Sequence, residues 1–476
     1  MRCGQRGLTP CEHRVTDPTD FDTAGAGELA AAIAAGRLSA LEACDAAIRR
    51  IEARDAAINA VVVRDFERAR EQARERDLRR ARGERGPLLG VPMTVKESFD
   101  VAGLPTHWGL LPLRDHRPRE DALAVARLKA AGAVILGKTN VPPALADWQA
   151  TNPIHGRTVN PHDPTRSPGG SSGGSAAALA SGMVPLELGS DIGGSIRVPA
   201  HFCGVFGHKP SFGLLPSRGH QFPGTDGADV GLAVIGPLAR SAADLGLALG
   251  VLAGPTEDDA VAYRASLPAP RHAQLPGWRV LVLDAHPSAA TDSELRAAVL
   301  RVGDAVARAG ARVERTSALL PDLAAANQAY TAMLTAIITR GVPGEHAVIS
   351  AHDWFALLDR RERVRRQWRA LFGAFDVVLA PPFGCAAFPH VDEPVWRQRT
   401  LQIDGEATPY GAQLAWPGLA SFAGLPATVV PVGRGAAGLP IGVQVIGPWL
   451  EDRSTIAFAG EVERLLQASA RPSEAA

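Results

Sequence analysis

The chain has 476 residues, of which 50 are Lys or Arg and 50 are Asp or Glu. This balance argues against a general role in binding nucleic acids or a membrane surface, because both need an excess of basic residues. No apolar run reaches the roughly 18 residues that a transmembrane helix needs, and residues 1–22 hold no apolar stretch typical of a signal peptide. The five cysteines are odd in number and scattered, which indicates reduced thiols and a cytoplasmic setting.

In chain order, the pattern predicts alternating helices and strands. Residues 1–23 are expected to form a mobile tail. Residues 28–54 carry apolar side chains mostly at three- to four-residue spacing, which predicts a helix, and residues 66–85, rich in Arg and Glu, predict a solvent-exposed helix. Short apolar runs predict strands at residues 134–136, 280–283, 377–379, 428–430 and 443–446. Such alternation implies a layered α/β core around a largely buried sheet.

Two clusters of glycine and serine, at residues 169–175 and 189–197, are the most informative part of the sequence. A flexible linker of this composition would have polar, unstructured flanks. Here the residues between the clusters predict a helix of small residues that ends at Gly182, followed by a buried strand. The clusters therefore lie at junctions inside a folded core. The pattern indicates that of the hydroxyls of Ser171 and Ser195 one is a nucleophile and the other relays its proton.

Lysine is rare in this chain, and its positions are informative. The four lysines are Lys96, Lys129, Lys138 and Lys209. A buried ammonium group can lose its proton and act as a base, whereas a guanidinium group cannot. Lys96 ends an apolar, strand-like run, where burial would lower its pKa. Lys138 and Lys209 also end such runs, and Lys96 next to Glu97 is also consistent with an ordinary salt bridge, so position alone does not choose among the lysines.

Further blocks of the chain resemble the amidase signature family of serine hydrolases, in particular its stand-alone bacterial-type amidases. The blocks follow in order across most of the chain, at residues 90–92, 95–96, 137–140, 160–182, 189–200, 204–210, 236–240, 424–427 and 438–444. The resemblance implies an α/β fold with a single large mixed β-sheet sandwiched between helices. It implies one domain at residues 24–476, with the signature region at about 85–255 and segments of the substrate pocket at about 277–470.

The resemblance also implies the roles of the site residues. Ser195 would be the nucleophile, Lys96 the base, and Ser171, in a cis peptide, the bridge between them. The backbone N–H groups that would form the oxyanion hole belong to Ile192, Gly193, Gly194 and Ser195. These residue types suit such roles, because a serine needs a base to become nucleophilic and consecutive small residues in a turn aim several N–H groups at one point.

The neighbouring polar side chains are expected to support the site. Asp191 and Arg197 are interpreted as a buried pair that fixes the turn of the nucleophile, and substrate contact is the alternative. Ser172 is expected to support its loop, and Ser190 likewise.

The expected reaction is hydrolysis of a carboxylic amide to a carboxylate and an amine or ammonia. Ser195 attacks the carbonyl while its proton passes through Ser171 to neutral Lys96. The leaving nitrogen is then protonated, and water releases the acyl group. Carbamates and esters share this chemistry and stay as alternatives. The expected partner is a small-molecule amide, with no nucleic acid and no membrane, and a homodimer is left open.

A metal and a cofactor are not expected. The sequence holds neither a His-Glu-x-x-His motif nor paired Cys-x-x-Cys motifs, which are the common signatures of metal sites. The Ser–Ser–Lys chemistry that the resemblance implies needs neither.

Two other nucleophiles fit parts of the sequence. Residues 170–174 match Gly-x-Ser-x-Gly, the nucleophile elbow of α/β-hydrolases, with Ser172 as nucleophile and Asp392 or Asp404 as a partner. An elbow must follow a strand, but two prolines precede this one, and the last histidine, His390, precedes both aspartates. A thiol nucleophile at Cys203 is disfavoured, because a Cys between Phe and Gly is typical of a small core residue.

Membership of a tRNA-dependent amidotransferase complex, as its amidase subunit, is the alternative from another functional class. The resemblance includes such subunits, which act only within a larger complex. That subfamily tends to carry an Asp-Gln pair before Ile-Gly-Pro, whereas this chain has Leu232, Ala233 and Val234 there. The difference weakens this alternative.

Contacts to the substrate are expected from variable segments at residues 328–348, 354–368 and 386–416. Their large apolar side chains include Tyr330, Met333, Phe355, Trp368, Trp396, Tyr410 and Trp416. Side chains of this kind can line an apolar pocket for an aryl or alkyl amide, although each of them also fits a position in the core.

Overall fold

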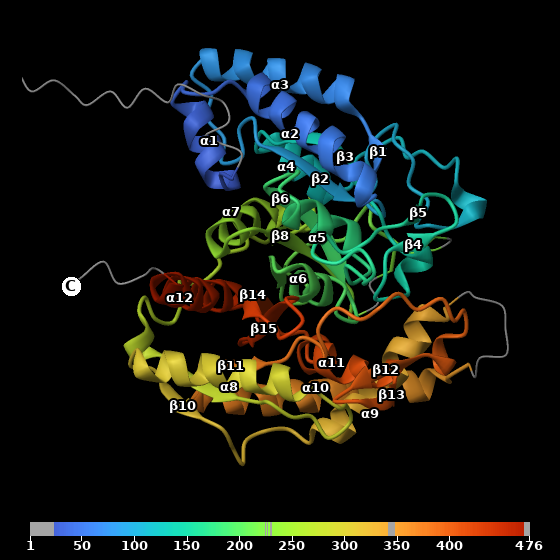
Figure 1. Cartoon of the computed structure of the whole chain (residues 1–476), viewed down its shortest axis with the longest axis vertical. Helices are drawn as coiled ribbons and strands as arrows, with labels where there is room; N and C mark the ends of the chain where they lie inside the picture. The colour runs from blue at the N-terminus through green and yellow to red at the C-terminus, as the bar shows by residue number, and fades with distance from the viewer. Residues whose placement is uncertain (1–22, 224, 226, 229–230, 341–347, 471–476) are drawn as a thin grey trace, which may run out of the picture.

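The computed structural model describes residues 23–470 except residues 224, 226, 229–230 and 341–347. One 11-stranded mixed sheet runs through the molecule, in the order β1-β3-β2-β6-β8-β7-β14-β15-β11-β9-β10 (Figure 1). In that order its strands are Val61–Arg64, Val134–Thr139, Pro92–Lys96, Leu186–Asp191, Val234–Ala239, Phe206–Lys209, Ala427–Arg434, Pro440–Ile446, Val377–Ala380, Arg279–Val282 and Arg312–Glu314. The expected single large mixed sheet is confirmed.

Both parallel and antiparallel pairs occur in this sheet. β2 pairs in parallel with β3 and with β6, whereas β6, β8, β7, β14, β15 and β11 form successive antiparallel pairs. The central strands are buried along their whole length, as expected for a sheet covered on both faces. Each of the five apolar runs that predicted a strand lies in or overlaps a strand of this sheet.

Helices cover the sheet on both faces (Figure 1). α5 and α6 pack against each other and on β6 and β15, whereas α7 and α12 pack against each other and on β8 and β14. The helices α1 to α12 are Ala26–Ala34, Ala40–Arg54, Phe66–Ala81, Leu123–Ala130, Gly173–Ala180, Arg197–Cys203, Ala242–Leu252, Ser293–Arg308, Leu323–Ile338, Ala351–Ala374, Ala415–Ser421 and Asp452–Ala470.

Two small hairpins lie outside the large sheet. One pairs β4 (Thr151–Asn152) with β5 (Gly156–Arg157), and the other pairs β12 (Thr400–Ile403) with β13 (Glu406–Pro409). The first directly follows the segment that carries Trp148. The second belongs to the C-terminal half, which contributes strands to the same large sheet as the N-terminal half.

The single helix predicted at residues 28–54 is wrong, because the structure has two helices there. Gly36 has a φ of 72°, a left-handed conformation that glycine adopts without strain and that ends α1. Ser39 then caps α2: its hydroxyl accepts the N–H of Glu42, and the Glu42 carboxylate accepts the N–H of Ser39. This capping box was a readable signal in the sequence.

The charged helix predicted at residues 66–85 is α3, which ends at Ala81. One of its arginines departs from the expected solvent-exposed face. Arg76 is buried and donates to the carbonyl oxygens of Gly132 and Lys129, at 3.3 and 3.2 Å. Its guanidinium group therefore ties α3 to the end of α4 and the loop after it.

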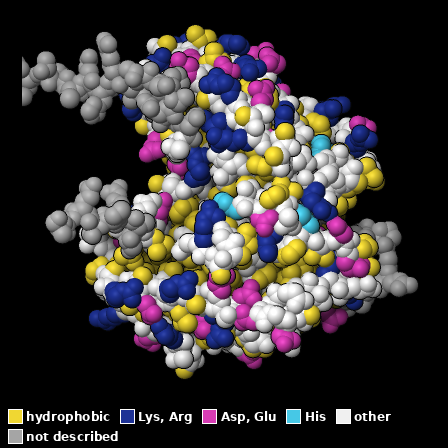
Figure 2. All heavy atoms as spheres, viewed as in Figure 1, with side chains coloured by type: hydrophobic (Ala, Val, Ile, Leu, Met, Phe, Trp, Pro, Cys, Tyr) yellow, Lys and Arg dark blue, Asp and Glu magenta, His cyan; other side chains and the backbone are white. Residues whose placement is uncertain are grey.

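Some sequence-based expectations concern parts of the chain that the structure does not describe. The mobile tail expected at residues 1–23 lies, apart from its last residue, outside the described residues, as do Cys3 and Cys11. Cys44, Cys203 and Cys385 are buried free thiols. Within the described part, none of the helices combines the length and the apolar character needed to cross a membrane. Basic and acidic side chains are interspersed over the visible face (Figure 2).

Candidate active site

The predicted site residues lie at the carboxyl ends of two neighbouring strands of the sheet. β2 and β6 are parallel neighbours, with Val95 opposite Leu188, so their carboxyl ends meet there. Lys96 is the last residue of β2, and Ser195 lies in the turn between β6 and α6. Ser171 lies in the loop directly before α5. The exposed fractions of these three residues are 0%, 6% and 1% in that order, so the group is nearly enclosed.

Lys96 contacts two serine hydroxyls. Its Nζ donates to Ser171 Oγ at 2.7 Å and to Ser190 Oγ at 2.9 Å. The other two buried lysines lie elsewhere: Lys138 Nζ donates to Thr106 Oγ1 at 2.8 Å, and Lys209 Nζ donates to the Pro210 carbonyl at 2.9 Å. The contact to Ser190 was not predicted, although Ser190 stands near the end of the strand beside that of Lys96.

The salt bridge from Lys96 to Glu97 does not form. Neighbouring residues of a strand point to opposite faces, and Glu97 lies against another group of residues. Its carboxylate accepts the N–H groups of His107 and Trp108, at 2.7 and 2.9 Å, and stands 3.7 Å from Lys138 Nζ. Among the described residues, Lys96 is therefore left with the hydroxyls of Ser171 and Ser190 and the Ser190 carbonyl, and with no carboxylate within salt-bridge distance.

Burial strongly affects the protonation of Lys96. Because the low-dielectric interior disfavours the charged form, burial holds the pKa of Lys96 well below its usual value of 10.5, and the carboxylate of Asp191 opposes this shift. A lysine in this state holds a larger share of neutral amine near neutral pH than an exposed one. Neutral amine is the form that can accept a proton.

The two glycine-rich loops are joined through Ser172. Its N–H donates to the Ser195 carbonyl at 3.1 Å, and its hydroxyl lies 3.4 Å from both backbone groups of Ser190. The peptide bond between Gly170 and Ser171 is cis. Among the described residues no hydrogen bond joins the hydroxyls of Ser171 and Ser195, and such contacts often tighten only when substrate binds.

The backbone N–H groups of the loop at residues 192–195 are of two kinds. The N–H of Gly194 donates to Asp191 Oδ1 at 2.9 Å. Within the described part of the chain, the N–H groups of Ile192, Gly193 and Ser195 donate to no protein acceptor. Gly194 has a φ of 97°, a conformation that favours glycine. The loop that carries Ser195 therefore holds three N–H groups without an acceptor among the described residues.

Asp191 and Arg197 form a buried pair behind this loop. Arg197 Nη2 lies 2.9 Å from Asp191 Oδ1, and Arg197 also donates to the Pro417 carbonyl and the Ser421 hydroxyl. Burial alone would raise the pKa of Asp191, but the Arg197 guanidinium brings that pKa down to about 2. Asp191 and Arg197 are thus a buried ion pair in the structure.

Comparison with known proteins places the whole chain among known relatives. A family model described as Amidase matches residues 42–342 and 331–456. AtzE of Pseudomonas sp. (strain ADP), which is named as one subunit of 1-carboxybiuret hydrolase, is 38% identical over 452 residues, which cover 89% of this chain and 95% of that protein. The chain belongs to the amidase family. It is therefore a hydrolase that acts on amides, and its mixed sheet between helices is the amidase signature fold.

Two further relatives show the range of this family. One subunit of the glutamyl-tRNA(Gln) amidotransferase of Roseiflexus castenholzii (strain DSM 13941 / HLO8) is 34% identical over 483 residues, which cover 91% of this chain and 94% of that protein. A bacterial aryl acylamidase of the amidase signature family has a crystal structure that aligns with a TM-score of 0.80 at 27% identity, covering 94% of this chain and 99% of that one. The amidase is thus similar both to an acylamidase and to proteins named as subunits.

The structure does not support the nucleophile elbow at Ser172 in this amidase. No strand occupies the described residues directly before it, and its proposed partners are engaged elsewhere. Asp392 pairs with Arg157, and Asp404 accepts the N–H and hydroxyl of Ser293. Cys203 is buried, which raises the pKa of its thiol well above 9.0 and keeps it protonated.

Most of the side chains expected to line a pocket are core residues of the amidase. Those with little or no exposed surface are Tyr330, Met333, Trp368, Tyr410 and Trp416. Trp396 is half-buried, and Phe355 is 61% exposed on α10. Part of the segment at residues 328–348 lies outside the described residues. The aromatic residues of these segments therefore build the core to a large extent.

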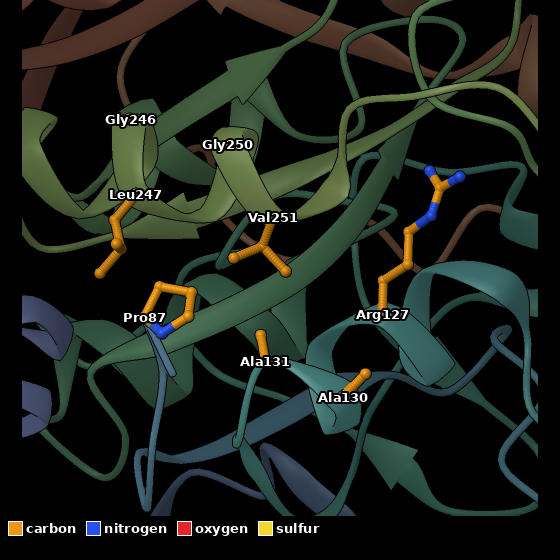
Figure 3. A pocket seen from close by; sticks show the side chains of 8 residues that line it. All are labelled: Pro87, Arg127, Ala130, Ala131, Gly246, Leu247, Gly250 and Val251. Carbon is orange, nitrogen blue, oxygen red and sulfur yellow. The ribbon is translucent and has the colours of Figure 1, made fainter. Parts of the chain in front are cut away.

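A surface cavity of about 490 Å³ lies away from the glycine-rich loops, between α4 and α7 (Figure 3). Leu247 and Val251 of α7 face Pro87 across it. At its rim the Arg127 guanidinium donates to the Leu252 carbonyl at 2.6 Å. None of the predicted site residues lines this cavity, and the part of the chain that the structure describes holds no cluster of three His, Cys, Asp or Glu suited to a metal ion.

Removing one member of the buried pair is expected to destabilise the amidase strongly. Asp191→Ala leaves the fully buried Arg197 guanidinium without its carboxylate, which costs about 3 to 5 kcal/mol of the free energy of unfolding. Denaturant unfolding at neutral pH measures this loss. The control is Asp304→Ala, which removes the exposed partner of Arg315 and is expected to cost about 1 kcal/mol or less. Equal losses in the two variants would contradict the prediction.

Proposed function

We propose that this amidase cleaves a carboxylic amide through an acyl-enzyme on Ser195, with Lys96 as the base and Ser171 as the proton bridge. The observation that carries the proposal is the 2.7 Å contact between Lys96 Nζ and Ser171 Oγ, made by a lysine whose pKa burial lowers. This pair lies at the same sheet edge as Ser195. Its position matches the need of a serine nucleophile for an adjacent base.

The proton and the electron pairs move in a closed sequence. Ser195 Oγ attacks the amide carbonyl carbon, its proton passes to Ser171 Oγ, and the proton of Ser171 passes to Lys96 Nζ. The tetrahedral intermediate collapses, the C–N bond breaks, and the same relay in reverse protonates the leaving nitrogen. Water then attacks the ester of Ser195 and gives a proton to the relay. The carboxylic acid leaves, and the Ser195 hydroxyl is restored.

The backbone of the loop would stabilise the charge on the carbonyl oxygen. Of the four N–H groups that the resemblance assigns to the oxyanion hole, those of Ile192, Gly193 and Ser195 have no acceptor within the described residues, and that of Gly194 donates to Asp191. N–H groups held in place before reaction stabilise developing charge without reorganisation. Asp191 and Arg197, with Ser172, would keep the loop in this conformation.

The substrate is proposed to be a small-molecule amide, with carbamates and esters as alternatives because they pass through the same tetrahedral intermediate. The aryl acylamidase neighbour makes aryl amides a sensible first probe. A panel of aryl amides, fatty amides, small primary amides and carbamates, each tested for kcat/KM, decides among them. Buried free cysteines agree with a reducing setting, and we propose the cytoplasm.

The purified chain alone is expected to release an amine or ammonia from a simple amide. The reason is that Lys96, Ser171, Ser195 and the free N–H groups all come from one chain. The second candidate function, action only within a complex of several chains, is favoured by relatives whose names contain the word subunit. Activity that appears only after adding amidotransferase partner subunits and charged tRNA would contradict self-sufficiency.

A further inference from the structure

The oxyanion loop, residues 192–195, is held from its carbonyl side by two aromatic side chains. The hydroxyl of Tyr330 donates to the Ile192 carbonyl at 2.8 Å, and the indole Nε1 of Trp148 donates to the Gly193 carbonyl at 2.9 Å. Tyr330 belongs to α9, and Trp148 lies in the loop that leads to β4. Two consecutive peptide groups of the loop are thus bonded to distant parts of the chain.

The orientation of a carbonyl determines that of the N–H in the same peptide group. In a trans peptide the C=O and N–H point in opposite directions, so the bond from Tyr330 to Ile192 sets the direction of the Gly193 N–H. The next peptide group is held at both ends, because Trp148 binds its carbonyl and Asp191 accepts the Gly194 N–H. Glycine peptides rotate easily, so a loop with two glycines needs such external bonds.

Trp148 is itself firmly placed. Its ring packs against Phe383, Trp396 and Tyr410, with ring centroids 4.8 to 5.3 Å apart. The preceding residue, Asp147, accepts hydrogen bonds from Tyr410 Oη at 2.8 Å and Arg399 Nη1 at 2.6 Å. These partners come from the C-terminal half of the chain.

The segment that carries Trp148 also packs on the other loop of the site. A Cβ added at Gly170 would lie 2.4 Å from the Asp147 carbonyl oxygen and 2.5 Å from that of Gln149. Gly170 forms the peptide bond to Ser171, so the backbone of residues 147–149 lies directly against the loop of the bridging serine. One segment therefore contacts both glycine-rich loops.

Tyr330 is suited to act as a permanent donor. Its side chain has no exposed surface, and burial raises the pKa of its hydroxyl well above 10.0, so the proton stays on the oxygen. The ring lies over Gly418, where an added Cβ would come within 2.7 Å of Tyr330 Cδ1. This close approach leaves the ring little freedom to turn its hydroxyl away from Ile192.

We propose that Tyr330 and Trp148 are positioning residues that hold the oxyanion loop from its carbonyl side. In this position the Gly193 N–H faces the oxygen of the substrate carbonyl that Ser195 attacks. The inference rests on the proposed role of Ser195. This role needs no contact of either side chain with the substrate. Their action is through the peptide groups that they bind, and they couple the C-terminal half of the chain to the reacting centre.

The test uses Tyr330→Phe and Trp148→Phe, which remove the donor and keep an aromatic ring. We expect each variant to lower kcat about 10- to 100-fold, a smaller effect than removing an oxyanion donor itself. KM is expected to change less than about threefold, because the N–H groups of the loop act mainly in the transition state. A boronic acid that adds to the nucleophile carries the tetrahedral geometry. The affinity of the enzyme for this boronic acid is expected to fall by about the same factor as kcat, whereas its affinity for the carboxylate product is expected to stay unchanged.

The matched control is Trp278→Phe. Trp278 is fully buried, and within the described residues its Nε1 has no hydrogen-bond partner, so this variant repeats the loss of packing without touching the loop. Its kcat and boronate affinity are expected to match those of the parent, and melting temperatures report folding in all variants. A kcat within twofold of the parent in both loop variants, or equal losses in Trp278→Phe, would overturn the inference. An active Ser195→Ala enzyme would instead overturn the proposed function itself.

Discussion

Ser195→Ala is expected to abolish amide hydrolysis, with kcat reduced on the order of 10⁶-fold, the scale reached when a serine hydrolase loses its nucleophile. The substitution removes one oxygen that makes no hydrogen bond within the described part of the structure, and it leaves the backbone of the loop unchanged. We therefore expect the melting temperature to stay close to that of the parent. Turnover of the best amide of the panel, measured beside thermal unfolding, checks both halves of the expectation.

Covalent labelling distinguishes the candidate nucleophiles directly. A serine-directed phosphonate is expected to add its mass to the peptide that contains Ser195 and to leave Ser195→Ala unlabelled. Ser172 has its hydroxyl against the backbone of Ser190 and is expected to stay unmodified. Mass on the Ser172 peptide, or near-parental turnover by folded Ser195→Ala, would remove Ser195 from the proposed role.

The parts of the site that lie within one loop or one strand could be read from the sequence. Glycines at 193 and 194 indicate backbone conformations that larger residues avoid, and Gly194 indeed has a positive φ. A lysine that ends an apolar run indicates burial, and Lys96 is fully buried. The absence of a salt bridge between Lys96 and Glu97 could also have been predicted, because neighbouring residues along an extended chain point to opposite faces.

Contacts between distant segments could not be read in this way. Trp148 lies 45 residues from Gly193, and Tyr330 lies 138 residues from Ile192. No local pattern links such pairs, since a buried aromatic residue in the core and one that donates to a carbonyl of the loop at residues 192–195 look the same in sequence. Tyr330 was interpreted as a candidate for lining a pocket, and its hydroxyl instead bonds to the oxyanion loop.

Lys96→Arg is expected to lower kcat by about 10²- to 10⁴-fold, the range for loss of a general base. Arginine keeps the positive charge but cannot give up its proton. It can therefore replace a lysine with a structural role but not one that acts as a base. Lys96→Met removes the charge and keeps an unbranched side chain, and it should be equally inactive. In Lys129→Arg the partly exposed pair with Asp121 at 2.8 Å can re-form, so this control should keep parental turnover. An active Lys96→Arg enzyme would contradict the base role.

The charge state of Lys96 also predicts the dependence on pH. Neutral amine is the working form, so kcat/KM should rise with pH through the lowered pKa of Lys96 and stay high in mild alkali. The free energy of unfolding is also expected to rise with pH. Between the lowered pKa of Lys96 in the folded state and its unfolded value near 10.5, the unfolded chain binds one more proton than the folded chain, so raising the pH favours the folded state. Lys96→Met should lose that increment, which denaturant unfolding of both proteins across this pH range measures. Activity that peaks in acid and falls above neutrality would be inconsistent with a neutral Lys96 as the base.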